Sequence, residues 1–222
     1  MVSVMTLNLF AQKDVTTFLG IPVDGFKSEM KQKLIAKGFV PKRSNNTEYF
    51  EGEFNGKDVH IHIVTNNNKV YRLYLADVNK LNEADIINRF NTLIYQFQNN
   101  KRYITKDDIT TIPQDENIMY EMSVNNKIYE ANFYQKPKPE TVDSLNIQKE
   151  VEKKILEHYT QEELQNPTDK VIEDVTYLYL AEVASRLYSK SVWFRIFKTN
   201  YDEYYIGMYY DNEYNKPNGE DL

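Results

Sequence analysis

Two histidines separated by a single residue form the pair in this sequence whose spacing most directly suggests chemistry. His60 and His62 lie in a segment that alternates apolar and polar residues, so both imidazoles point to the same side of a predicted β-strand. Residues at this spacing are roughly 6.6 Å apart, and their imidazoles can converge on one divalent metal ion. Glu51 is expected opposite His60 on the neighbouring strand, where it would supply a third ligand.

This set indicates one candidate function, a metal-dependent hydrolase. The alternative is a solvent-facing strand on which Glu51 and His60 form a surface pair that contributes less than about 1 kcal/mol. The chain has no cysteine, which excludes thiol catalysis and Cys-ligated metals, and it has no nucleophile elbow or HExxH motif. We therefore expect no cofactor, with a divalent metal at His60 and His62 as the alternative.

Tyrosine is over-represented, with 18 copies in 222 residues. Exposed tyrosines offer a large rigid contact area with a hydrogen-bonding tip, which suits a protein or carbohydrate partner. The alternative is that these rings pack beneath residues 211–222 or against a second layer. Four tyrosines fall at positions predicted to point outward from the sheet and are the candidate ligand-binding residues: Tyr49, Tyr74, Tyr205 and Tyr209.

Composition narrows the classes of partner. The formal net charge is −6, which argues against nucleic acid as a partner because phosphate contacts need a basic surface. No run approaches the roughly 18 apolar residues of a membrane span. Residues 2–10 are apolar and uncharged and are followed by Ala11, as at the end of a signal peptide that lacks its basic start. We expect residues 1–12 to be a truncated signal peptide and the protein to be periplasmic or extracellular.

Residues 47–77 predict a three-stranded antiparallel meander. Strands at 47–54, 57–65 and 69–77 are joined by Asn55-Gly56 and by three asparagines, and Asn-Gly favours the type I′ turn of a tight hairpin. A two-residue loop places Phe50 opposite Ile61, which makes one face of the meander apolar and the other polar.

The rest of the chain adds helices and two further hairpins. Residues 27–37 and 81–99 carry apolar residues at helical spacing, and residues 136–139 form a stiff Lys-Pro linker. We predict one α+β domain over residues 13–222, a two-layer arrangement of a mainly antiparallel sheet with amphipathic helices on one face, and similar lobes that meet near residues 100–116. The remaining elements are hairpins at 118–133 and 191–210 and helices at 147–159 and 168–188.

Three segments resemble an uncharacterised family of exported bacterial α+β proteins. They are FLGIPVDGFKSEMKQKLIAKGF, EGEFNGKDV and the ending YYDNEYNKPNGEDL, and the resemblance spans most of residues 18–222. The resemblance implies export and no assigned activity, so it transfers no site residues. Our leading hypothesis is an exported, non-catalytic binding protein that uses the polar, tyrosine-rich face of the sheet.

Overall fold

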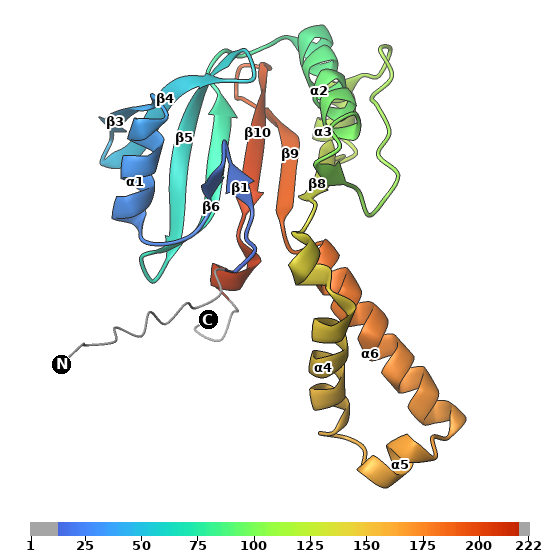
Figure 1. Cartoon of the computed structure of the whole chain (residues 1–222). Coiled ribbons are helices and arrows are strands. Elements are labelled where there is room, and N and C mark those ends of the chain that lie inside the picture. Colours follow the sequence, from blue (N-terminus) through green and yellow to red (C-terminus); the bar gives the residue numbers. More distant parts are fainter. Residues whose placement is uncertain (1–12, 218–222) are drawn as a thin grey trace, which may run out of the picture.

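The predicted three-stranded meander forms part of an eight-stranded antiparallel sheet (Figure 1). The computed structural model describes residues 13–217, so the signal peptide predicted at residues 1–12 lies outside the described part. The sheet has the order β3-β4-β5-β6-β10-β9-β8-β7. In that order the strands are Val40–Ser44, Thr47–Phe54, Lys57–Asn66, Lys69–Asp77, Tyr204–Asp211, Ser191–Lys198, Glu130–Gln135 and Tyr103–Ile104.

Asparagine turns set the register of the meander as predicted. Phe50 pairs with Ile61 and Phe54 with Lys57, and Asn55 and Gly56 both have the positive φ that a type I′ turn requires. A strand that sequence reasoning missed, β3, precedes β4 and pairs with it through a turn at Asn45-Asn46, where φ is again positive. Its Pro41 is tolerated because β3 is an edge strand.

Two amphipathic helices cover one face of the sheet. Helix α1 (Lys27–Ala36) packs over β5 and β6, and α2 (Glu83–Gln98) packs over β9 and β10. Asn82 precedes the first turn of α2 and caps it by accepting a hydrogen bond from the Asp85 amide. The α+β fold with helices against an antiparallel sheet is confirmed. A two-stranded sheet of β1 (Thr17–Phe18) and β2 (Ile21–Pro22) adds Phe18 to the same core.

The prediction of a hairpin at residues 118–133 is wrong. Residues Ile118–Ser123 form helix α3, because Asn117 caps its first turn and Ile118 is buried in the core. The remaining segment becomes β8 and pairs with β9 instead. A hairpin would also have placed Glu121 opposite Glu130, an unfavourable pair that the helix avoids.

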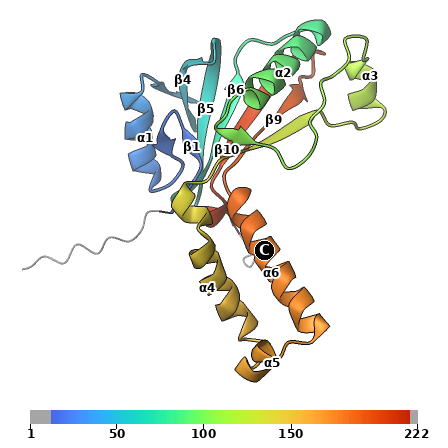
Figure 2. The same cartoon turned by 45° about the vertical axis from the view of Figure 1, so that its right-hand side comes forward.

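A helical arm projects from the sheet between β8 and β9, as both views show (Figures 1 and 2). Its helices pack mainly on one another and not on the sheet. Ile172 of α6 is 51% exposed, because α6 packs mainly against the other elements of the arm. The arm consists of the 3₁₀ turn η1 (Pro139–Val142), α4 (Ser144–Ile155), α5 (Gln161–Gln165) and α6 (Asp169–Leu187).

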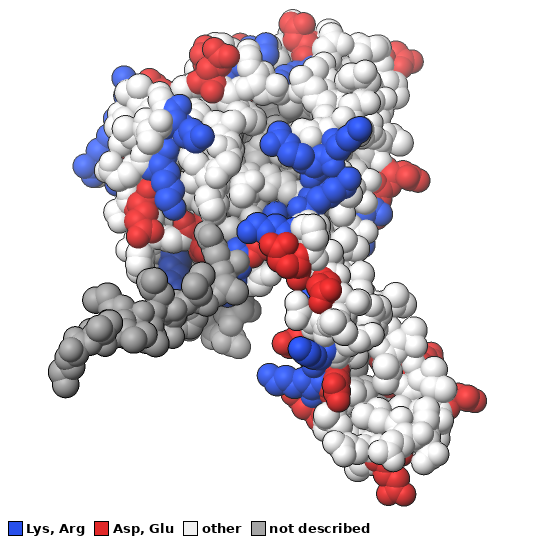
Figure 3. All heavy atoms as spheres, in the orientation of Figure 1, with Lys and Arg blue, Asp and Glu red and all other residues white. Residues whose placement is uncertain are grey.

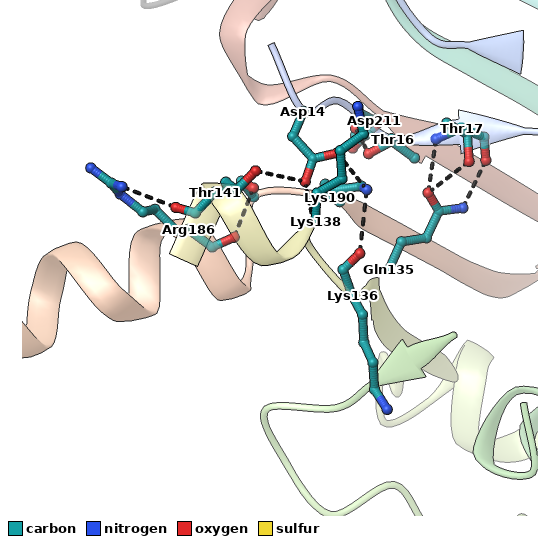
Figure 4. Close-up of polar contacts among 11 residues, drawn as sticks. Asp14, Thr16, Thr17, Gln135, Lys136, Lys138, Thr141, Arg186, Lys190 and Asp211 are labelled. Atoms are coloured by element: carbon teal, nitrogen blue, oxygen red, sulfur yellow. Dashed lines mark hydrogen bonds and ion pairs between the residues drawn. The ribbon is translucent and has the colours of Figure 1, made fainter. Parts of the chain in front are cut away.

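A polar network fastens the base of the arm to the start of the described chain (Figure 4). The Lys190 ammonium lies 2.8 Å from one Asp14 carboxylate oxygen, and both side chains are buried. The other Asp14 oxygen accepts hydrogen bonds from the Lys138 amide at 2.7 Å and from the Thr141 hydroxyl at 3.2 Å. Burial raises the pKa of Asp14, but these partners outweigh it and hold that pKa below its usual value.

A substitution at Gly52 tests how tightly β4 packs against Phe39. A Cβ at this position would overlap the ring of Phe39, which is itself buried. We expect Gly52→Ala to lower the free energy of unfolding by about 1–3 kcal/mol, the usual cost of overpacking. Urea denaturation would measure this cost. In a Phe39→Leu background the same change should cost clearly less, and an equal cost in both backgrounds would refute this account of the contact.

Candidate functional site

The sheet face opposite α1 and α2 carries all four predicted tyrosines. Strand alternation requires this, because Phe50, Ile61 and Leu75 point into the core from the same strands. Tyr49, Tyr74, Tyr205 and Tyr209 are each partly exposed. The structure therefore brings them onto one face, as the sequence predicted.

An aromatic row crosses five neighbouring strands on this outer face. Ring centroids are 5.7 Å apart for His62 and Tyr74, 4.8 Å for Tyr74 and Tyr209, and 3.9 Å for Tyr209 and Trp193. Interplanar angles in these three pairs lie between 11° and 24°, so each ring stacks on the next. We define the aromatic row as Tyr49, His60, His62, Tyr74, Tyr209 and Trp193, in order from β4 to β9.

Tyr205 lies in a second group beside the row. Its ring stacks on Phe197 at 5.3 Å, and the Lys80 ammonium lies 3.8 Å from its centroid. Gly207 makes this arrangement compact, since a Cβ there would run into the rings of Phe197 and Tyr74. The outer face thus combines the aromatic row with an adjoining patch of aromatic and cationic side chains.

A partly buried ion pair lies beside one end of the row. The Arg72 guanidinium donates to both oxygens of Asp211, at 2.6 and 2.8 Å, and the Trp193 indole donates to the same carboxylate at 3.0 Å. Burial raises the pKa of Asp211, but the hydrogen bonds from Arg72 and Trp193 outweigh burial and keep it below its usual value. The arginine also lies 5.0 Å from the ring centroid of Tyr209. We call this network of Arg72, Asp211 and Trp193 the clasp. It fixes the orientation of the aromatic row where the row crosses β6, β10 and β9.

The three predicted metal ligands lie on the same face, where they contact one another and neighbouring side chains. His60 Nε2 is 3.6 Å from Glu51 Oε1, and Glu51 also pairs with Lys42 at 3.5 Å. His62 stacks between Tyr49 and Tyr74. Within residues 13–217, no three side chains of the types His, Cys, Asp and Glu are grouped so that they could hold a metal ion. The geometry gives the metal-dependent hydrolase no support.

The part of the C-terminal tail that the structure describes does not cover the four tyrosines. Asn212 donates to the Val23 carbonyl, and Asn215 donates to the Val70 carbonyl and to Asp24. These contacts hold residues 212–217 at the end of β6, beside the loop before α1, and η2 (Glu213–Asn215) lies at that end of the sheet in Figure 1. We therefore take the aromatic row as the candidate site.

Sequence reasoning missed Trp193, Arg72 and Asp211 as members of this site. Trp193 alternates with the buried Val192 and Phe194, so its outward direction could have been read from the strand pattern. Arg72 and Asp211 are 139 residues apart, and no local pattern marks them as partners.

Comparisons with known proteins identify no relative. No family model, no curated protein and no solved structure matches the chain. The resemblance to an uncharacterised exported family therefore stays a prediction. Among residues 13–217, no helix combines the length and the apolar character that crossing a membrane requires.

Breaking the clasp should destabilise the fold. Arg72→Gln leaves the Asp211 carboxylate buried without its main partner, and we expect a loss of about 3 kcal/mol in the free energy of unfolding at pH 7. Because the pKa of Asp211 is depressed by folding, its contribution is present above about pH 4 and is lost as the pH falls below that. Arg72→Gln should therefore also flatten the acid side of the stability curve. Arg43→Gln, at an exposed position on β3, is the control and should change neither quantity. Equal losses in both variants would contradict this role.

His62 supplies a second pH-dependent effect. Burial and the nearby His60 lower the pKa of His62, so the unfolded chain binds a proton at this residue more readily than the folded one. Stability should consequently rise with pH up to about 6.5, the pKa of an unperturbed histidine. Urea denaturation between pH 5 and 7 should show a smaller rise in His62→Gln than in wild type. His158→Gln, on the arm, serves as the matched control, and a rise unaffected by His62→Gln would refute the effect.

Proposed function

We propose that this chain is an exported, non-catalytic binding protein that docks a protein partner on the aromatic row. The observation that carries the proposal is the row itself, a continuous stack of partly exposed rings on the face opposite the helices. Aromatic side chains on rigid strands offer contact area at a small cost in conformational entropy, which is typical of the central residues of protein interfaces.

The stacking favours a protein over a carbohydrate. A sugar ring binds an aromatic side chain by lying on its open face, but the faces of Tyr74, Tyr209 and Trp193 are turned toward one another. What remains for a partner is ring edges and hydroxyl tips, which suit the side chains and backbone groups of another protein.

Charges on the outer face differ from one side to the other. Glu53 and Asp58 lie opposite each other on β4 and β5 and form no ion pair within residues 13–217, whereas Arg195 lies on β9 and Arg72 is already paired with Asp211. Such a division orients a partner with complementary charges and raises its association rate at low ionic strength. The partner we propose therefore presents basic residues toward β4 and β5 and acidic residues toward β9.

Export is the part of the proposal that rests on sequence alone. Residues 2–10 contain no charged side chain, and Ala11 follows them, as at the end of a signal peptide. The partner would accordingly be a periplasmic or extracellular protein.

Tyrosine substitutions test the proposed surface. Tyr49→Ala and Tyr209→Ala each remove one ring from the row, and we expect a co-purifying partner to bind at least about tenfold more weakly to either variant. Affinity purification of the exported protein, with quantification of each bound protein, makes the measurement. Recovery of equal amounts of a partner with wild type and with both variants would contradict the proposal.

Matched controls separate binding from folding. Tyr95→Ala on α2 and Tyr177→Ala on α6 delete the same side chain at positions 67% and 71% exposed and away from the row. These variants should retain the partner in full. Thermal unfolding of all four variants establishes that the chain remains folded, and a partner lost equally from the controls would count against the row.

A further inference from the structure

A cleft lies on the face of the sheet that α1 and α2 cover, between the β1–β2 turn and the C-terminal end of α2. Its volume is about 830 Å³, which is in the size range of small-molecule sites. Figure 3 shows Lys and Arg side chains gathered beside this cleft, although the whole chain carries a net charge of −6. We call it the basic cleft and define it by Phe54, Lys101, Arg102, Tyr103 and Lys136.

Three cations at the cleft lack an acidic partner in the described chain. Lys101, Arg102 and Lys136 are exposed, and none forms an ion pair within residues 13–217. The backbone holds two of them side by side, because the Lys136 amide donates to the Arg102 carbonyl at 2.8 Å. Lys190 also lines the cleft, but its charge is already matched by Asp14.

The helix end explains only part of this charge. Lys101 and Arg102 follow the C-terminus of α2, where the helix dipole favours cations. Lys136 comes from the end of β8 and has no such reason to be there. Three cations converging from two elements create a local positive potential that a single helix terminus does not require.

The inner wall of the cleft is aromatic. Phe54 and Tyr210 contact edge to face with centroids 6.4 Å apart, and Tyr103 packs edge-on against Phe97 at 4.7 Å. Gln135 is nearby and is held by Thr17, whose amide donates to its side-chain oxygen at 2.8 Å. A ligand entering the cleft therefore meets apolar rings on one side and cations on the other.

We propose that the basic cleft binds a small organic anion, an aromatic or apolar body that carries a phosphate or carboxylate group. Arg102 and Lys136 bind the anionic oxygens, and the body packs against the partly exposed rings of Phe54 and Tyr103. The cleft lies on the opposite side of the sheet from the aromatic row, so this inference does not rest on the proposed function.

Phenyl phosphate is the probe that combines both features. Isothermal titration of the full chain at low ionic strength should give saturable binding of one molecule per chain. Benzoate tests the carboxylate form of the ligand, benzyl alcohol removes the charge, and inorganic phosphate removes the ring. We expect phenyl phosphate or benzoate to bind at least about tenfold more tightly than benzyl alcohol and inorganic phosphate, and the tighter of the two identifies the anionic group.

Paired substitutions locate the site. Arg102→Gln with Lys136→Gln should weaken phenyl phosphate binding at least about tenfold, because two charge-assisted contacts are lost. Lys149→Gln with Lys153→Gln on α4 makes the same change in net charge at exposed positions of the arm and should leave binding unchanged.

Three results would overturn the inference. These are no saturable binding of either anion at about 10 mM, equal binding of benzyl alcohol, and equal weakening in the α4 control. Both double variants change exposed side chains only, and circular dichroism of each would verify its fold.

Discussion

The pairing of β6 with β10 is the constraint on which the rest of this structure depends. It joins β3 and the meander to the other half of the sheet, and it places the last strand of the described residues in the middle. The register sets Tyr74 opposite Tyr209 and Arg72 opposite Asp211, so one alignment creates both the stacked pair and the partly buried ion pair. A shift by one residue would move these side chains to the core face and put Leu73 and Leu75 into solvent.

That single register divides the sheet into two chemically different faces. Ile206 and Met208 of β10 point into the core under α2, and Tyr205 and Tyr209 point outward from the same strand. Helices α1 and α2 and the β1–β2 turn cover the inner face, and the basic cleft opens between that turn and α2. The fold thus offers two separate surfaces with different chemistry, an aromatic one outside and a cationic one inside.

The helical arm adds length without disturbing this register. Phe133 of β8 pairs with Val192 of β9, although the whole arm lies between them in sequence. Antiparallel neighbours tolerate a long connection because the entropic cost of loop closure grows only slowly with length. The Asp14–Lys190 pair and its hydrogen bonds at the arm base hold the ends of this connection to the sheet.

Local patterns in the sequence determined the meander register, the N-cap of α2, the core faces of α1 and α2, and the outward direction of the four tyrosines. Each of these depends on residues close together in the chain, such as Asn55-Gly56 or the alternation around Ile61. Only the tertiary structure decided that β10 lies beside β6, that β8 pairs with β9, and that α6 leaves the sheet. Partners such as Arg72 and Asp211 are chosen by the summed packing of distant strands, and that sum leaves no periodic trace in the sequence around either residue.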